Sequence, residues 1–411
     1  MYLCYFLLVP VYNVYVGGFG LQRNLVNLVL LLAFFVQLRK LQINAKIFYP
    51  FILLFFLQLL QIPFQGVIPI DLQFNACRQE CMSSIIFPLV LWNVAQKDVK
   101  YSKLVSKVFI ACIAVVTLYG LFLTTMPGVN PYIQVMLRVM GGEFNEAYAA
   151  GNSGLTTMTS LNSYRLFGRI SSTFTHPMAF GLFLSLSVVY CYMRMNYEKG
   201  KMPLLVFVLT VADVFVCGIR TPIAVFFILL LFYLLYMHRI KTAAQIALAC
   251  LVGMLIIHTV PTLDTLISSI FDSKGGDVGG SSINMRINQL AYCFDILGED
   301  FLFGKGYAWT TFYLSGGRTH PLLLAFESLA FVVLCNNGVV GVIIWILSII
   351  VLFKVVCGEI ASKDGRIFVW AVSLAYFAYS MITGEYGYMK YYILFYTMIF
   401  LQLRMEKERS K

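Results

Sequence analysis

Charged residues are scarce in this chain, and their scarcity limits what the protein can be. Asp, Glu, Lys and Arg make up 12% of the 411 residues, whereas 60% are hydrophobic and the mean hydropathy is +0.81. A soluble domain cannot enclose that much apolar surface in one core, so the composition indicates a polytopic membrane protein. The apolar runs are continuous rather than alternating, which favours helices over the strands of a membrane barrel.

Several familiar binding signatures are also missing from the sequence. It has no Asp-x-Asp pair to hold a divalent ion against a diphosphate, and no Gly-x-x-x-x-Gly-Lys-Ser/Thr loop to cradle phosphates. The net charge of +11 comes from short basic clusters between apolar runs, so nucleic-acid binding is not expected. Cys77 and Cys81 could pair with each other, but their surroundings do not resemble a zinc site. We therefore expect neither a metal nor a cofactor.

Apolar runs of roughly 15–20 residues recur along the chain, and each can cross about 30 Å of hydrocarbon as a helix. We predict an all-α protein with about twelve spans in a single transmembrane domain over residues 1–411. The first run lacks the basic start and cleavage site of a removable signal, so we expect it to be a retained span. The predicted helices cover residues 1–16, 21–38, 45–62, 82–95, 104–126, 177–194, 203–217, 222–237, 243–261, 338–356, 367–383 and 388–403.

Basic residues predict the orientation of these spans, because Lys and Arg are enriched in short cytoplasmic loops of membrane proteins. With both termini in the cytoplasm, nineteen of the thirty basic residues fall in inner segments. Two long connectors, residues 127–176 and 262–337, then lie on the outer face. In the second connector, residues 322–334 form an apolar segment that Glu327 interrupts. We predict a helix there that lies along the outer face or dips partway into the membrane.

Three arginines are predicted at or near the outer ends of spans: Arg169, Arg220 and Arg286. A guanidinium group can bind phosphate oxygens two at a time, so several converging arginines could bind a diphosphate. Each arginine alone could instead reach lipid headgroups. Arg220 could also form a structural ion pair with Asp213, seven residues before it on the same predicted helical face.

Motifs around these arginines occur in order within residues 165–357. They are Arg169-Ile-Ser-Ser-Thr-Phe-Thr-His176-Pro177, Cys217-Gly-Ile-Arg220, Met285-Arg286-Ile-Asn-Gln-Leu, Leu302-Phe-Gly304-Lys-Gly306-Tyr, and Glu327-Ser328-Leu followed by Asn337-Gly-Val-Val-Gly341. The ordered set resembles the O-antigen polymerase and ligase superfamily, membrane glycosyltransferases of bacterial surface polysaccharide. Glu327-Ser328 stands where ligases of this superfamily carry His-Asn, so the chain resembles a polymerase more than a ligase.

The resemblance implies an enzyme of GT-C-like architecture in the bacterial inner membrane, with its active face periplasmic. Its substrates would be glycans linked to polyprenyl diphosphate, polymerised into O-antigen, capsular polysaccharide or exopolysaccharide. Its partners would be membrane lipid, a flippase and chain-length regulator proteins. One alternative is an O-antigen ligase that transfers the glycan to lipid A core or to a protein. Another is a polytopic transporter, because about twelve spans with both ends inside is a common carrier layout.

The implied reaction assigns roles to five residues. Arg169, Arg220 and Arg286 would bind the diphosphate, and Arg286 would also stabilise the charge that develops on it as it departs. The acceptor hydroxyl must lose a proton, and Glu327 is favoured as the base, because a carboxylate in an apolar helix should have a raised pKa. His320 is the second candidate, since the unperturbed pKa of histidine is near neutral. A buried ion pair between Glu327 and an arginine is the structural alternative.

Other residues in these motifs have simpler explanations. His176 precedes Pro177 at the first turn of a helix, where we expect a capping or packing role. Gly304-Lys305-Gly306 predicts a turn rather than a phosphate site. Nearby aromatic residues could stack on sugar rings, although anchoring at the membrane interface is the commoner use. These aromatic residues are Tyr307, Trp309, Phe312 and Tyr313.

Overall fold

The fold is known from a computed structural model of the 411-residue chain, in which every described secondary-structure element is a helix. The all-α class predicted from the sequence is therefore confirmed for these residues. The structure describes residues 20–38, 49–64, 68–126, 130–132, 135, 169–174, 176–198, 200–238, 245, 283–316, 319–323, 326–359, 363–383 and 389–409.

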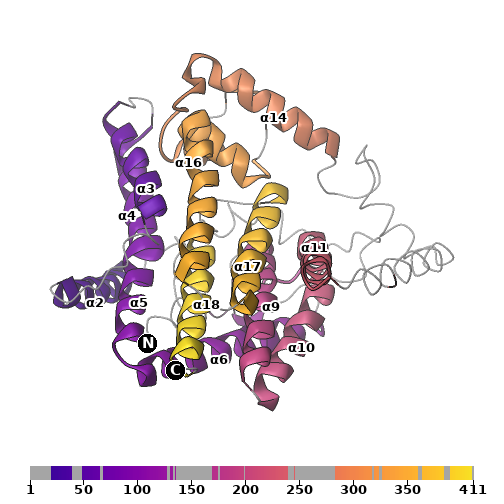
Figure 1. Cartoon of the computed structure of the whole chain (residues 1–411). Helices are drawn as coiled ribbons and strands as arrows, with labels where there is room; N and C mark the ends of the chain where they lie inside the picture. Colours follow the sequence, from indigo (N-terminus) through magenta and orange to yellow (C-terminus); the bar gives the residue numbers. More distant parts are fainter. Residues whose placement is uncertain are drawn as a thin grey trace. The chain divides into compact units, whose positions relative to one another are not determined.

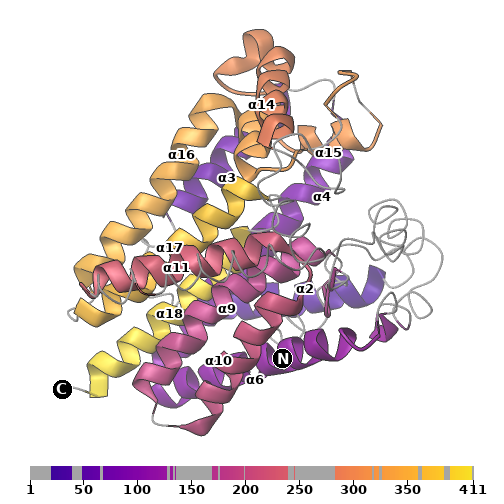
Figure 2. The same ribbon diagram turned by 90° about the vertical axis from the view of Figure 1, so that its right-hand side faces the viewer.

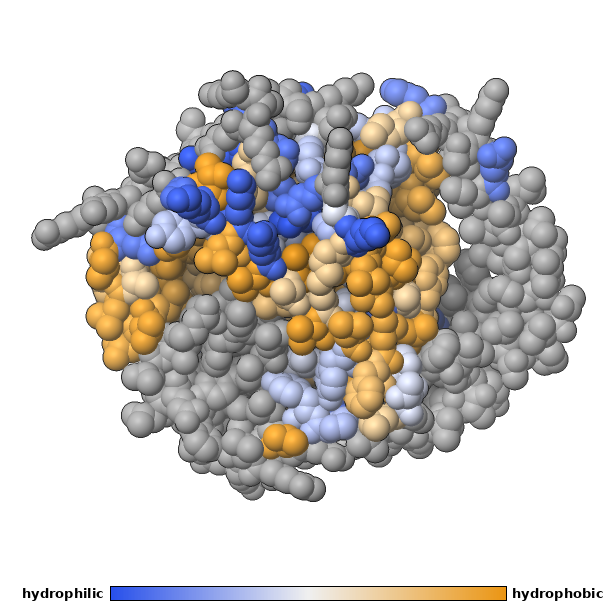
Figure 3. Space-filling view, turned by 90° about the horizontal axis from the view of Figure 1, so that it is seen from below, coloured by the Kyte–Doolittle hydropathy of each residue, from blue (hydrophilic) through white to orange (hydrophobic). Residues whose placement is uncertain are grey.

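Four helical segments in the described part of the chain are long and apolar enough to cross a membrane: Val99–Leu123, Pro177–Tyr197, Leu329–Val351 and Gly365–Ile382. Three shorter apolar helices accompany them: Leu28–Gln37, Ile52–Gln61 and Arg220–Tyr236. Many large apolar side chains remain exposed on the helices, and they form broad apolar areas in Figure 3. Such surfaces suit contact with lipid. The count of about twelve spans stays a prediction. The predicted spans 1–16 and 243–261 lie outside the described residues, apart from residue 245.

The chain divides into two compact units, and each is described by itself. Unit 1 comprises residues 1–23 and 108–286, and unit 2 comprises residues 24–107 and 287–411. The boundaries fall within α2 (Gly20–Leu38), α6 (Val99–Leu123) and α14 (Ile283–Leu297), so parts of these helices belong to each unit.

Unit 1 is organised around helix α9 (Pro177–Tyr197), which packs against α10 (Lys201–Val216) and α11 (Arg220–Tyr236) (Figure 1). Most α9 side chains are buried. The helix begins with Pro177 at its first turn, and the His176 Nδ1 atom accepts a hydrogen bond from the Met178 N–H at 3.2 Å. The predicted capping role of His176 is thus confirmed.

The first half of unit 2 contains α3 (Tyr49–Gln61), a short 3-10 turn (Ile62–Phe64) and a long helical stretch. This stretch joins α4 (Ile70–Glu80), a π-helical segment (Cys81–Ile86) and α5 (Phe87–Lys97) without a break. The sequence predicted a span only over residues 82–95, with Cys77 and Cys81 in a connector. Both cysteines are instead helical and have free thiols, so they do not form a disulfide bond.

The second half of unit 2 contains α16 (Leu329–Glu359), α17 (Lys363–Ile382) and α18 (Met389–Arg409). Helix α17 packs against both α16 and α18 (Figures 1 and 2), while α3 packs on α16 and α5 packs on α18. A helix over residues 322–334 was predicted ahead of a span over residues 338–356. The helix begins later than predicted, at Leu329, and at Gly338 the backbone leaves helical geometry, so a short helical segment precedes a longer one that starts where the span was predicted. The placement of the short segment along the outer face stays a prediction.

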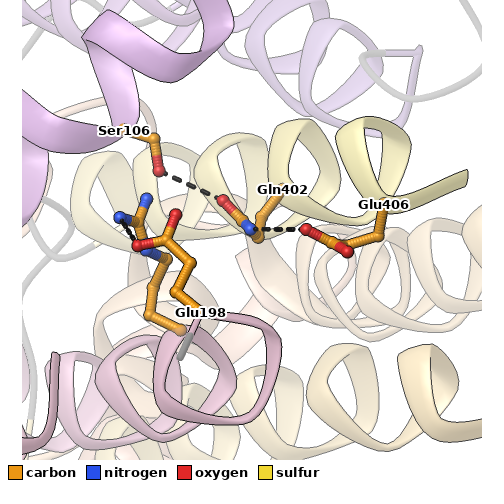
Figure 4. A network of polar contacts seen from close by, with 5 residues as sticks. Ser106, Glu198, Gln402 and Glu406 are labelled. Carbon is orange, nitrogen blue, oxygen red and sulfur yellow. Dashed lines mark hydrogen bonds and ion pairs between the residues drawn. The ribbon is translucent and has the colours of Figure 1, made fainter. Parts of the chain in front are cut away.

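Polar side chains form contacts both between helices and at the end of a helix. In unit 2, the Ser106 hydroxyl of α6 donates to Gln402 of α18 at 3.2 Å, and the Gln402 amide donates to Glu406 at 3.4 Å (Figure 4). In unit 1, Glu198 forms an ion pair with Arg194 one helical turn earlier (Figure 4). The Ser106–Gln402 contact pairs two polar side chains that are buried within unit 2.

Candidate functional site

A backbone contact brings the motif of Arg169 against the turn that carries Arg220. The Ile170 N–H donates to the Cys217 carbonyl at 3.0 Å. Ile170 directly follows Arg169, and Cys217 lies three residues before Arg220. Gly218 permits this tight turn because its φ is 70°, a value that glycine adopts without strain. Helix α11 then begins at Arg220. The two arginines, both half-buried, therefore lie on neighbouring backbone segments of unit 1.

Arg286, in the first turn of α14, acts electrostatically on Arg220. Burial lowers the pKa of Arg220, and the positive charge of Arg286 lowers it further. The two guanidinium groups therefore lie within the range of a Coulombic interaction. Unit 1 thus holds Arg220 and Arg286 within that range and places Arg169 beside the turn before Arg220. These are the three residues that the sequence assigns to diphosphate binding.

Asp213 does not pair with Arg220, so the predicted ion pair is wrong. The Asp213 side chain is fully buried, and neither carboxylate oxygen has a hydrogen-bond partner among the described residues. Helix α10 ends at Val216 and the chain turns before Arg220, so the two side chains do not share a continuous helical face. The carboxylate instead faces Gly120 of α6, where a Cβ added to the glycine would lie 2.4 Å from Asp213 Oδ2.

Glu327 lies just before helix α16 rather than inside an apolar helix. It is half-buried, and its N–H donates to Gln289 Oε1 of α14 at 3.4 Å. The next residue, Ser328, caps α16: its hydroxyl accepts from the Ala330 N–H at 3.2 Å and donates to the Ser380 carbonyl at 3.3 Å. Glu327 was predicted to lie inside an apolar helix, and this is wrong because it precedes the helix. Its role as a base stays a prediction.

His320 uses one ring nitrogen to hold a local turn. Its Nδ1 atom accepts hydrogen bonds from the Leu322 and Leu323 N–H groups, both at 3.2 Å, and its ring packs 4.7 Å from the Tyr292 ring. When Nδ1 is an acceptor, a neutral imidazole carries its proton on Nε2. In this arrangement His320 offers a donor at Nε2, and its role as the second candidate base stays a prediction.

The aromatic residues near the Gly304–Gly306 turn are mostly interior. Tyr307, Trp309 and Tyr313 are at most 7% exposed, and the Trp309 and Tyr313 rings pack on each other and on Phe326. The Tyr313 hydroxyl contacts the carbonyls of His320 and Leu323 at 3.0 Å each. These three side chains therefore pack in the interior of the fold. The sequence had suggested that they stack on sugar rings or anchor the protein at the membrane interface.

The Gly304–Gly306 turn supports a break in helix α16. At Gly338 the backbone leaves helical geometry, with φ 66° and ψ −166°. The Lys305 and Gly306 N–H groups donate to the carbonyls of Cys335 and Asn336 at 2.8 and 2.9 Å, and the Val340 N–H donates to Leu302 O at 3.2 Å. The turn thus satisfies backbone groups that the broken helix cannot pair itself, as an apolar environment requires. This confirms Gly304-Lys305-Gly306 as a turn.

Buried amide side chains surround this break, and they were not predicted from the sequence. Gln61 of α3 donates to the Phe303 carbonyl and accepts from Asn337 Nδ2 at 2.7 Å. Gln73 of α4 donates to the Tyr307 carbonyl at 3.3 Å, and Asn336 Oδ1 accepts from the Thr310 N–H at 2.8 Å. The one sequence signal for them is the Asn336-Asn337 pair inside an apolar run.

Glu80, a carboxylate at the end of α4, was not predicted from the sequence either. It is half-buried, and its Oε2 atom accepts a hydrogen bond from the Tyr307 hydroxyl at 2.7 Å. Burial raises the pKa of Glu80 to about 7, although the Tyr307 hydrogen bond acts in the opposite direction. Glu80 lies outside the four candidate spans. It was missed because residues 77–81 were predicted to be a connector.

No protein family model matches the chain, and a comparison with curated proteins gives no match either. The likeness to the O-antigen polymerase and ligase superfamily therefore rests on the ordered motifs. Among the described residues, no group of three or more His, Cys, Asp and Glu side chains is placed to hold a metal ion.

Proposed function

We propose that the protein is a membrane glycosyltransferase that joins polyprenyl-diphosphate-linked glycans into a surface polysaccharide at the outer face of the inner membrane. The observation that carries this proposal is the grouping of arginines in unit 1. Arg220 and Arg286 lie close enough for their charges to interact, and the Arg169 segment is bonded to the turn before Arg220. Like charges held together repel each other, and a ligand with two or more negative charges relieves that repulsion.

A diphosphate leaving group fits this arrangement chemically. In the transfer, the acceptor hydroxyl oxygen bonds to the anomeric carbon while the bond from that carbon to the diphosphate oxygen breaks. The electron pair leaves with the polyprenyl diphosphate, and planar guanidinium groups stabilise the charge that develops there. The hydroxyl proton passes to a base, for which Glu327 and His320 are the candidates from the sequence.

The direct test is product formation by the purified protein in lipid vesicles. Polyprenyl-diphosphate-linked repeat units supplied alone should give a ladder of longer glycans on a gel. The absence of a ladder with the wild-type protein would remove the polymerase proposal. A product that forms only after lipid A core is added would show the ligase alternative instead.

Arginine variants test the proposed diphosphate site. Arg169→Ala, Arg220→Ala and Arg286→Ala should each lower the rate about 10²- to 10³-fold, the usual loss when a charge-stabilising donor is removed. Arg220→Lys should recover only part of the loss, because lysine keeps the charge without the planar fork. Arg366→Ala, at an exposed position in α17, is the matched control and should retain wild-type activity. Full activity in the three alanine variants would remove these residues from the site.

A transporter is the second candidate, and the break in α16 favours it. Discontinuous helices and buried polar side chains in a membrane protein often mark a substrate path, and Asn336, Asn337 and Gly338 have both features. The same vesicles distinguish the two proposals. A carrier would move glycan or a small solute across the bilayer with no new glycosidic bond, whereas the enzyme would lengthen the glycan.

A further inference from the structure

Two cysteine side chains of unit 2 lie in contact although they belong to different helices. Cys293 is on α14 and Cys335 is near the start of α16, and their thiol groups form a hydrogen bond with each other. Both residues are free thiols in the structure, and both are 0% exposed. Two thiols within hydrogen-bond distance need only small side-chain rotations to come within reach of a covalent S–S bond.

The contact between the two thiols is part of a buried face of α14. Gln289, Cys293 and Leu297 follow one another at intervals of four residues, which places them on one side of the helix, and all three are buried. Gln289 Oε1 accepts a hydrogen bond from the Glu327 N–H, two residues before α16 begins at Leu329. The face of α14 that carries Cys293 is therefore directed at the start of α16, as a second contact besides the thiols shows.

The chain that follows α14 holds the end of this helix against α16. The 3-10 turn Gly298–Phe301 and helix α15 (Trp309–Leu314) both pack on α16. The Lys305 N–H donates to the carbonyl of Cys335 itself at 2.8 Å. The backbone of unit 2, and not only the orientation of two side chains, therefore keeps the sulfur atoms of Cys293 and Cys335 together.

We propose that Cys293 and Cys335 are oxidised to a disulfide bond that ties α14 to the start of α16. The basic-residue pattern predicts that residues 262–337, which include both cysteines, lie on the outer side of the membrane. On the outer side of a bacterial inner membrane the environment is oxidising, so disulfide bonds form there and persist. The inference does not depend on the proposed glycosyl transfer.

The oxidation needs an electron acceptor, and a thiol–disulfide oxidoreductase with a disulfide of its own is the class that fits. The thiolate of one cysteine attacks that disulfide, which gives a mixed disulfide and releases one thiolate of the oxidant. The second cysteine then attacks the mixed disulfide, so the Cys293–Cys335 bond forms and the oxidant leaves as a dithiol. Two electrons and two protons thus pass from the cysteine pair to the oxidant. Because both thiols are buried in the folded unit, we expect the exchange to take place while the chain folds.

The test maps the thiols of the full-length protein in the membranes of the cells that express it. Free thiols are blocked with N-ethylmaleimide in denaturing detergent, the protein is reduced, and the thiols released by reduction are labelled with deuterated N-ethylmaleimide. Peptide mass spectrometry should find the second label on Cys293 and Cys335, and a digest made without reduction should contain one species that joins their two peptides. The first label on both residues, or a peptide that joins either one to a third cysteine, would overturn the inference.

Cys293→Ala gives a second readout, and Cys112→Ala is its matched control, because Cys112 is a buried cysteine of unit 1. In Cys293→Ala the Cys335 thiol should take the first label, whereas Cys112→Ala should leave the joined peptides unchanged. Dithiothreitol should lower the unfolding temperature of the wild type by about 5 °C, because reduction frees the unfolded chain, and should not lower that of Cys293→Ala. An equal fall in both proteins would place the cross-link at other cysteines and contradict the inference. If Cys293→Ala does not fold, the peptide map of the wild-type protein decides alone.

Discussion

The two units differ in the polar side chains that they hold close together. In unit 1, Arg220 and Arg286 place like charges together, and a backbone bond between Ile170 and Cys217 brings the Arg169 segment to the same turn. In unit 2, buried amides and one carboxyl surround a helix break, through contacts such as Gln61 with Asn337, 276 residues apart. The amides bond to one another and to backbone groups, which suits a framework. Grouped arginines repel one another, which suits an anionic ligand.

The largest effect is expected at the break in α16, and it tests whether that framework depends on glycine. Gly338→Ala adds a Cβ that would lie 2.3 Å from the Leu302 carbonyl oxygen, at a positive φ that alanine rarely adopts. Backbone cannot move as easily as a side-chain tip, so we expect the free energy of unfolding to fall by about 3 kcal/mol or more. Thermal unfolding in detergent measures the change.

Gly298→Ala is the matched control for this change. Gly298 also has a positive φ, of 50°, but nothing lies within 4 Å of an added Cβ. Its substitution should cost about 1 kcal/mol from backbone strain alone. Equal losses in the two variants would mean that the close approach of Leu302 to Gly338 contributes nothing.

A smaller loss of stability is expected for substitutions of His320, and these substitutions distinguish a structural role of the residue from a catalytic one. His320→Ala removes the acceptor for two backbone N–H groups and should lower stability by about 1–2 kcal/mol. His320→Asn should restore most of the loss, because the asparagine Oδ1 atom can accept in the place of Nδ1. If His320 is the general base, His320→Asn keeps the stability and loses polymerisation. Unfolding and activity measured on the same preparations distinguish the two outcomes.

The helices were predictable where an apolar run is uninterrupted. Residues 177–194, 203–217 and 222–237 were predicted to within four residues of α9, α10 and α11, since turn residues and charges bound each run. Of the long helical stretch of residues 70–97, only residues 82–95 were predicted, because Asp71, Arg78 and Glu80 lower the local hydropathy of its first part. Asp71 and Arg78 stay exposed and Glu80 is half-buried, so this part of the stretch is helical without being apolar, and a search for apolar runs does not find it.

The candidate site was predictable only where its parts carry local motifs. Arg169, Arg220 and Arg286 each stand in a recognisable sequence context. Glu80 has no such context, and its hydrogen bond to Tyr307 joins residues 227 positions apart. Contacts of that kind depend on the whole fold of a unit rather than on any one stretch of sequence.

Asp213 gives unit 1 a buried acid of its own, and its replacement should have the smallest effect on stability and the opposite sign. Neither Asp213 oxygen has a hydrogen-bond partner among the described residues, so burial of the carboxyl is unfavourable. Asp213→Asn keeps the shape and cannot ionise, so stability at pH 7 should rise by about 1 kcal/mol. Asp295→Asn, at an exposed position in α14, should change stability by less than about 0.5 kcal/mol.

A loss of stability in Asp213→Asn would mean that the carboxyl group is satisfied by a partner outside the described residues. A gain in stability together with a loss of polymerisation would have a different meaning. Groups that destabilise a fold yet support activity belong to the working part of an enzyme. That outcome would place an acid as well as the arginines among the functional groups of unit 1.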